Sequence, residues 1–204
     1  MMVLFLILLP FQEKKSEKIQ STKYQGVRII LKGNFDKIPV HIQIDFGFGD
    51  IVTPKPNWID YPQLLNFGIP HLQVYTPESL IAEKYHAIVY LGQYNTRVKD
   101  FYDIYLLAQN NTFNGEILST AISATFHNRS TIIPDNIPLA FLQDFYQDKE
   151  KLNLWKAFLE KSNLVYIDFD QVTQLLVKFL MPLSLALSAN KPFRLNWSSN
   201  AQWH

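Results

Sequence analysis

The sequence lacks several features that would assign it to common protein classes. It has no cysteine among its 204 residues, which excludes disulfides and thiolate metal sites and fits a reducing cytoplasm. It has no run of lysine or arginine, and its net charge of +1 gives no bulk electrostatic argument for nucleic-acid binding. No Walker-type loop, dinucleotide fingerprint or Gly-x-Ser-x-Gly motif occurs. With 48% hydrophobic and 18% charged residues, the composition is that of a globular protein with one large domain or two small ones.

The sequence also lacks a long apolar run near its beginning. The apolar stretch from Met2 to Leu9 has eight residues, whereas a membrane span needs about 20. It has neither the basic start nor the small-residue cleavage site of a signal peptide. We therefore expect a buried strand, or a start left by truncation, and no membrane partner. A peripheral membrane protein held by its first eleven residues is a weaker alternative.

The first third of the chain has the alternation typical of strands. Residues 24–33 and 38–46 are strand-like and flank a short polar turn, so we predict a β-hairpin. In the second strand the apolar residues alternate with polar ones, which places Asp45 opposite the buried face. We expect residues 12–23 to form a linker or the end of a helix. We expect residues 52–70, with four prolines, to be irregular and residues 71–75 to form a short strand.

From Thr76 onward the patterns are helical. Thr76 followed by Pro77 is a typical helix start, and a second helix is predicted over residues 97–109. Further helices are predicted over 114–128, 138–147, 149–161 and 169–188, the last with a kink or restart at Pro182. Residues 191–204 show no periodicity and are expected to be a frayed tail. The expected fold class is α+β.

Charged residues gather on the first two of these helices. Lys84 lies on the first, and Arg97, Lys99, Asp100 and Asp103 lie on or at the start of the second. Asp100 and Asp103 are three residues apart and share one side of a helix. These groups either form salt bridges on a solvated surface or bind a charged ligand.

Several separate motifs resemble the AbiEii/AbiGii toxin family of nucleotidyltransferases. They occur in the family's order between about residues 24 and 160, and they are Ile44 to Pro54, Tyr61 to Leu65, Glu83-Lys84, Asn95 to Asp103 and Ala124 to Arg129. The resemblance implies that the protein is a toxin of a bacterial toxin–antitoxin or phage-defence system. Such toxins are usually encoded beside a DNA-binding antitoxin. The resemblance also implies a polymerase-beta-like domain that uses a nucleoside triphosphate and Mg²⁺, with RNA as the expected acceptor. We expect what remains of this domain at 24–110, a helical region at 111–190, and 1–23 and 191–204 as flanking segments.

We expect one family motif to be absent from this chain. Family members begin with a Gly-Ser or Gly-Gly-Thr turn followed by an Asp-x-Asp or Asp-x-Glu pair, which holds the triphosphate and magnesium. Here no aspartate precedes Tyr24, and the first glycine is Gly26. We therefore expect a truncated family member, produced by deletion, a split gene or a misplaced start codon, that is weakly active or inactive.

Asp45 and Asp50 are the candidates in the strand region. A carboxylate on the open face of a sheet can join a magnesium site, and Asp45 resembles the third carboxylate of nucleotidyltransferases. The alternative is a solvated strand acid. Asp50 follows Gly47 and Gly49, and is either a ligand or a turn aspartate that caps its own backbone.

The resemblance gives the helical cluster its expected roles. Lys84 would hold phosphate, although a lysine there could also extend along the core surface to reach solvent. In the family, the second helix contributes an essential acid, for which Asp103 is preferred to Asp100 as the residue facing Lys84. Arg97 and Lys99 would add nucleotide contacts. A solvated helix face with an ordinary Lys99–Asp103 pair is the alternative.

A rival hypothesis is a non-catalytic binding protein. Such a remnant would pair with an antitoxin or with a complementary N-terminal fragment, through the sheet edge that missing strands would leave.

Overall fold

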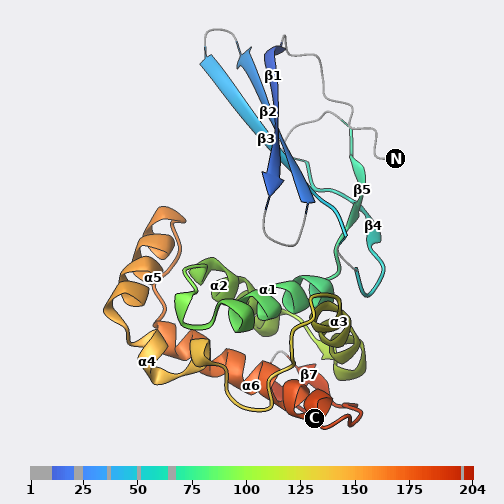
Figure 1. The fold of residues 1–204 in the computed structure, drawn as a ribbon, viewed down its shortest axis with the longest axis vertical. Helices are drawn as coiled ribbons and strands as arrows, with labels where there is room; N and C mark the ends of the chain where they lie inside the picture. Colours follow the sequence, from blue (N-terminus) through green and yellow to red (C-terminus); the bar gives the residue numbers. More distant parts are fainter. Residues whose placement is uncertain (1–10, 21–24, 36–37, 50–51, 64–67, 199) are drawn as a thin grey trace. The chain divides into compact units, whose positions relative to one another are not determined.

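The computed structural model describes residues 11–20, 25–35, 38–49, 52–63, 68–198 and 200–204 (Figure 1). The chain divides into two compact units, Met1–Asp50 and Ile51–His204. The strand-rich part and the helical part predicted from the sequence are both present, and the α+β class is confirmed. The apolar stretch from Met2 to Leu9 and the candidate Asp50 lie outside the described residues.

The first unit is an antiparallel sheet with strand order β1-β2-β3. Strand β2 (Gln25–Phe35) pairs with β3 (Ile38–Gly47), which confirms the predicted hairpin. Along β3, exposed His41, Gln43 and Asp45 alternate with partly buried residues, as the sequence pattern indicated. The expected linker or helix end over residues 12–23 is wrong, because Phe11–Gln20 forms strand β1. Its polar sequence hides the strand, which pairs with β2 through the backbone.

The second unit begins with a small hairpin. Strand β4 (Asn57–Asp60) pairs with β5 (His71–Val74), and β5 confirms the short strand predicted over residues 71–75. The region from 52 to 70 is therefore not irregular throughout. The proline-rich sequence concealed β4, whose partner lies more than ten residues further along the chain.

Six α-helices are described in the second unit. They are α1 (Pro77–Leu91), α2 (Val98–Asn110), α3 (Gly115–Asn128), α4 (Gln143–Tyr146), α5 (Lys149–Lys161) and α6 (Phe169–Ser188), with 3₁₀ turns at Gly92–Tyr94 and Leu139–Phe141. Five match the sequence patterns closely, but the helix predicted over residues 138–147 is wrong, since a 3₁₀ turn and a four-residue helix occupy this stretch. The Thr76 hydroxyl accepts a hydrogen bond from the backbone N–H of Ser79 and caps α1. The kink or restart expected in the last helix is not a break, because α6 continues through Pro182.

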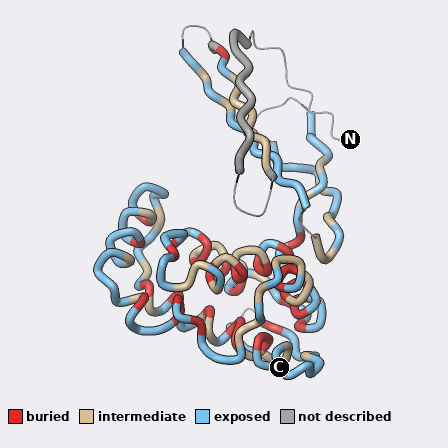
Figure 2. The backbone as a smooth tube through the Cα atoms, viewed as in Figure 1, coloured by how far each residue is buried: buried red, intermediate tan, exposed pale blue. Residues whose placement is uncertain are grey.

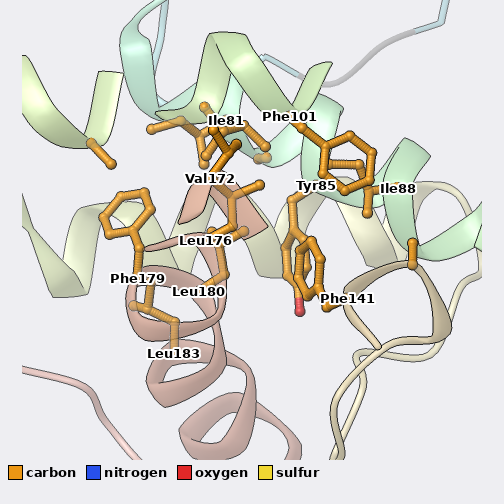
Figure 3. Close-up of a cluster of buried hydrophobic side chains, with 14 of the residues drawn as sticks. Ile81, Tyr85, Ile88, Phe101, Phe141, Val172, Leu176, Phe179, Leu180 and Leu183 are labelled. Atoms are coloured by element: carbon orange, nitrogen blue, oxygen red, sulfur yellow. The ribbon is translucent and has the colours of Figure 1, made fainter. Parts of the chain in front are cut away.

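The core of this unit forms around α6, against which α2 and α3 pack (Figures 2 and 3). Val172, Leu176 and Leu180 of α6 are completely buried, as are Ile81 and Tyr85 of α1. Among the described helices, α6 alone is long and apolar enough to cross a membrane. Its burial among the other helices is also that of a core helix in a globular protein.

The last residues of the chain correct another expectation. Residues 191–204 are not a frayed tail, since Asn196–Ser198 forms β7 and Gln202–Trp203 forms β8, in a small sheet with β6 (Phe113–Asn114). Trp197 is completely buried, and its indole N–H donates to the carbonyl oxygen of Ala108 over 2.6 Å. That carbonyl lies in the last turn of α2, where helical partners run out. This segment packs on the helices through isolated aromatic side chains, and isolated contacts leave no repeating apolar pattern in the sequence.

We expect Trp197→Ala to destabilise the helical unit by about 3–5 kcal/mol, because it empties a fully buried site and leaves the Ala108 carbonyl without its indole partner. The matched control is Trp58→Ala on β4, where the indole is 59% exposed and the expected cost is below about 1 kcal/mol. Chemical denaturation followed by helical circular dichroism measures both. Equal stability of the two variants would contradict the packing role of the last strands.

Candidate functional site

Lys84 and the charged residues of α2 come together in one cluster. The Lys84 ammonium lies 2.8 Å from a carboxylate oxygen of Asp100 and 2.6 Å from one of Asp103. Arg97 contacts the other Asp100 oxygen over 2.6 Å, and Lys99 contacts Asp103 over 2.6 Å. All five candidates that the sequence placed on these two helices are therefore in ion-pair contact. We refer to these five residues as the α1/α2 charge cluster.

The cluster has a buried inner part and an exposed outer part. The Asp100 side chain is 4% exposed and that of Lys84 is 13% exposed, whereas Arg97 and Lys99 are 60% and 66% exposed. Burial alone would lower the pKa of Lys84, but its bonds to Asp100 and Asp103 outweigh this and raise the pKa above 10.5. Lys84 is therefore charged at neutral pH.

The sequence analysis preferred Asp103 to Asp100 as the acid that faces Lys84. In the structure both carboxylates contact the Lys84 ammonium. Asp100 is the more deeply buried and also binds Arg97, while Asp103 bridges Lys84 and Lys99. Burial alone would raise the pKa of Asp103, but the hydrogen bonds from Lys84 and Lys99 lower it below 3.8. The i, i+3 spacing places both carboxylates within reach of one ammonium.

The cluster has a net positive charge. Its three cations and two carboxylates leave one positive charge, and the exposed side chains of Arg97 and Lys99 carry it toward solvent. Asn95 supports this arrangement, since its side-chain oxygen accepts a hydrogen bond of 2.7 Å from the Arg97 backbone N–H. Asn95 is completely buried, and its side-chain N–H₂ has no partner among the described residues. Such a cluster is suited to an anion.

A second group of motif residues packs beside α1. Arg129, at the end of α3, forms an ion pair with Glu83 and lies 3.3 Å from the Nδ1 atom of His86. The other ring nitrogen of His86 lies 2.8 Å from the Thr131 hydroxyl. Sequence reasoning did not connect Glu83 with Arg129, because they are 46 residues apart. Their separate motifs meet through a partly buried ion pair that ties the end of α3 to α1.

Asp45 lies in the first unit and forms an ion pair with Arg28. The Arg28 side chain binds both of its carboxylate oxygens, at 2.7 and 2.9 Å, and Gln43 donates a further hydrogen bond. The Arg28 hydrogen bond is the main reason that the pKa of Asp45 is lowered. Arg28 and Asp45 are direct register partners on β2 and β3. This geometry is that of a cross-strand ion pair.

The described residues do not assemble a magnesium site. Across the described ranges, no three His, Cys, Asp or Glu side chains converge as metal ligands. The expectation that the chain contains no Asp-x-Asp pair is wrong for the sequence itself, because Asp168 and Asp170 have this spacing at the start of α6. Buried Phe169 separates the two acids, and Asp168 accepts a hydrogen bond from Tyr166. Asp168 occupies the N-cap position of α6 and Asp170 lies in its first turn, and no third ligand joins them among the described residues.

The comparison with known families decides the classification. A family model described as nucleotidyl transferase AbiEii toxin, type IV toxin–antitoxin system, matches residues 6–174, well over half of the chain. The chain belongs to the AbiEii toxin family. Searches of curated proteins and of solved structures gave no match. The resemblance seen in the sequence motifs is confirmed, and AbiEii membership implies a nucleotide substrate and an antitoxin partner.

In this AbiEii-family chain, Asp100→Ala is expected to destabilise the helical unit by about 3 kcal/mol. This is the low end of the cost of breaking a buried ion pair, because Asp103 still pairs with Lys84. The control is Glu160→Gln, which removes an exposed pair of 3.9 Å with Lys156 and should cost less than about 0.5 kcal/mol. Denaturant titration measures the free energy of unfolding of both variants. A loss of stability in Asp100→Ala as small as that in Glu160→Gln would contradict a buried ion pair.

The shifted pKa values predict how the stability depends on pH. Because the folded pKa of Asp103 is lowered, its contribution is complete above pH 3.8 and is lost as the pH falls through the folded value. Because the folded pKa of Lys84 is raised, its contribution is complete below pH 10.5 and is lost as the pH rises through the folded value. The stability difference between the wild type and Asp103→Asn should therefore shrink at both extremes. A difference independent of pH would contradict this.

Proposed function

We propose that this chain carries the nucleotide-binding part of an AbiEii nucleotidyltransferase and that the α1/α2 charge cluster receives the phosphates of a nucleoside triphosphate. The observation that supports it is the convergence of Lys84, Arg97, Lys99, Asp100 and Asp103 with one net positive charge. Family membership supplies the reaction class. RNA is the proposed acceptor, and the proposed location is the cytoplasm.

The cations have distinct proposed roles. Arg97 and Lys99 are exposed enough to meet an incoming phosphate, and an arginine guanidinium can bind phosphate through two parallel N–H groups. Lys84 has three N–H donors, and the described contacts direct two of them to Asp100 and Asp103. The third can donate to a phosphate oxygen. The two acids hold Lys84 in place and keep it charged.

The three candidate carboxylates are paired with cations, so no step through magnesium is proposed for them. Family members use this ion, but Asp100 and Asp103 are neutralised by cations, and Asp45 binds Arg28 through both oxygens. For Asp45 to act as the proposed metal ligand, the Arg28 pair would have to open. No Gly-Ser turn followed by Asp-x-Asp precedes Tyr24 in the sequence. We therefore propose that the chain alone transfers nucleotides weakly or not at all.

Binding and transfer are tested separately. Arg97→Gln and Lys99→Gln should each weaken binding of a non-hydrolysable nucleoside triphosphate about 10-fold, the size expected for one charge-assisted hydrogen bond. Lys156→Gln, an equally exposed lysine on α5, is the matched control and should bind as the wild type does. Calorimetric titration measures all four proteins. Unchanged affinity in both variants would refute the phosphate role of the cluster.

Transfer is measured with the purified 204-residue chain, magnesium, labelled nucleoside triphosphates and an RNA pool. We expect little or no incorporation of label into RNA, because no Gly-Ser turn followed by paired carboxylates precedes Tyr24 to hold the ions. Appreciable magnesium-dependent transfer would overturn the proposal of a weak or inactive chain.

A second candidate function is a non-catalytic binding protein that pairs with the antitoxin or a complementary N-terminal fragment. The commitment of Asp45, Asp100 and Asp103 to ion pairs favours it. Strand β3 also lies at the edge of its sheet, where an added strand could pair. Co-expression with the adjacent antitoxin followed by size-exclusion chromatography tests it. A stable complex without triphosphate affinity would favour this function over the first.

A further inference from the structure

A pocket of about 430 Å³ lies between α2 and the segment that joins α5 to α6. This volume is within the range of sites that bind small molecules or single side chains. Tyr102 and Tyr105 of α2 line it on one side, and Tyr166, Asp168 and Gln171 line it on the other. Of the described residues in its wall, Asp168 alone carries a charge, so the pocket combines three phenol rings with one carboxylate.

Both walls of the pocket are held by the packing of the helices. On one side, the indole N–H of buried Trp155 donates to the carbonyl oxygen of Ile167 over 2.8 Å and fixes the segment before α6. On the other, the Tyr102 ring packs edge-on against Phe158 of α5, with 5.5 Å between the ring centroids. The pocket is therefore preformed and does not depend on a ligand for its shape.

The Asp168 carboxylate does not play the usual part of an aspartate at a helix start. Asp148, in the same position before α5, accepts hydrogen bonds of 3.0 Å from the backbone N–H groups of Glu150 and Lys151. Asp168 makes no such bond to α6 and instead accepts one of 2.9 Å from the Tyr166 hydroxyl. A side-chain cap stabilises a protein by about 1 kcal/mol. Asp168 forgoes this gain, and its exposed carboxylate is left accessible beside the pocket.

The negative charge of Asp168 is not compensated by a cation. Within the described ranges it pairs with no lysine, arginine or histidine side chain. The positive end of α6 is offset by Asp170, whose carboxylate accepts a 2.7 Å hydrogen bond from the Gln171 backbone N–H. The hydrogen bond to Asp168 is the main reason that the pKa of Tyr166 is raised, so this phenol stays neutral and keeps donating. The pocket therefore has a net negative charge.

Aromatic rings and an uncompensated carboxylate together select a cation, because the face of a tyrosine ring attracts positive charge. A planar guanidinium fits best, since it can stack on a ring while its N–H groups donate to a carboxylate. The surface beside the carboxylate is apolar, with Val165 90% exposed and Tyr166 63% exposed. Such a surface favours a guanidinium that belongs to a protein over a free one, because neighbouring apolar residues of the partner can cover it.

We propose that this pocket receives the arginine side chain of a partner protein. The guanidinium would lie against the tyrosine rings and donate to the Asp168 carboxylate, and the side-chain oxygen of Gln171 could accept a further N–H. An apolar residue next to the arginine would cover Val165. The inference does not rest on the proposed function, because no residue of the α1/α2 charge cluster lines this pocket.

The probes are two short peptides, acetyl-Leu-Arg-Leu-amide and the same peptide with citrulline in place of arginine. Each is titrated into the full chain and followed by nuclear magnetic resonance. Citrulline has the size of arginine but no charge, so its peptide is expected to bind about 10-fold more weakly, the effect of one charge-assisted hydrogen bond. Free arginine amide, which lacks the apolar neighbours, should also bind more weakly than the arginine peptide.

Two variants locate the binding. Asp168→Asn is expected to weaken binding of the arginine peptide about 10-fold, and its fold is retained because the new side-chain oxygen can still accept from Tyr166. Tyr166→Ala removes an exposed ring and should weaken binding about 2- to 5-fold. Asp144→Asn, which changes an exposed acid in the first turn of α4, is the matched control and should bind as the wild type does. The melting temperature of each variant checks its fold.

Four outcomes would overturn the proposal. The first two are no binding of the arginine peptide at millimolar concentration and equal affinity for the citrulline peptide. The third is undiminished affinity in a folded Asp168→Asn. The fourth is displacement of the peptide by a neutral nucleoside or by free arginine amide of equal affinity, which would assign the pocket to a small molecule. No nucleoside triphosphate enters the peptide titrations, so the proposed function can fail or succeed separately.

Discussion

The apolar packing around α6 is the interaction on which the described helical unit depends. This helix supplies a continuous buried surface, and α2, α3 and the last two strands all contact it. The helices of the candidate site are thereby held in fixed positions. The ion pairs between α1 and α2 form at the margin of this core, where both ends of a charged pair can be shielded without being entirely removed from water. Apolar burial supplies the stability, and the ion pairs specify how α1 and α2 meet.

Charge compensation is the common feature of the candidate residues. Each acid that the sequence suggested for catalysis is found beside a cation, whether on β3 or on α2. A carboxylate compensated by arginine or lysine has little attraction left for a divalent ion, while the α1/α2 charge cluster keeps one positive charge in excess.

Much of the helical unit could be predicted from the sequence. Thr76, Pro77 and Asn114 are local signals whose effect depends on few neighbours, so the starts of α1 and α3 could be predicted. The strands β1 and β4 were missed because their sequences are polar or rich in proline, and only their partners make them strands. The buried role of Trp197 depends on α2 and α6 and leaves no periodic signal.

The candidate cluster was partly predictable for the same reason. The i, i+3 and i, i+4 spacings on α2 placed its charges on one side, and the family motifs drew attention to Lys84. The pairing of Arg28 with Asp45 could not be read from either strand alone, since it depends on the register of the hairpin. The pairing of Glu83 with Arg129 similarly depends on how α1 and α3 pack.

The burial of Trp197 against Ala108 and Phe179 also concerns how the chain is made. These contacts join residues that the ribosome adds at very different times, 89 positions apart in one case. The helices can form from local contacts, but the site between α2 and α6 that Trp197 fills is completed only by a segment that follows both helices in the sequence. A nascent chain stalled shortly before this point would expose its aromatic core to chaperones and proteases.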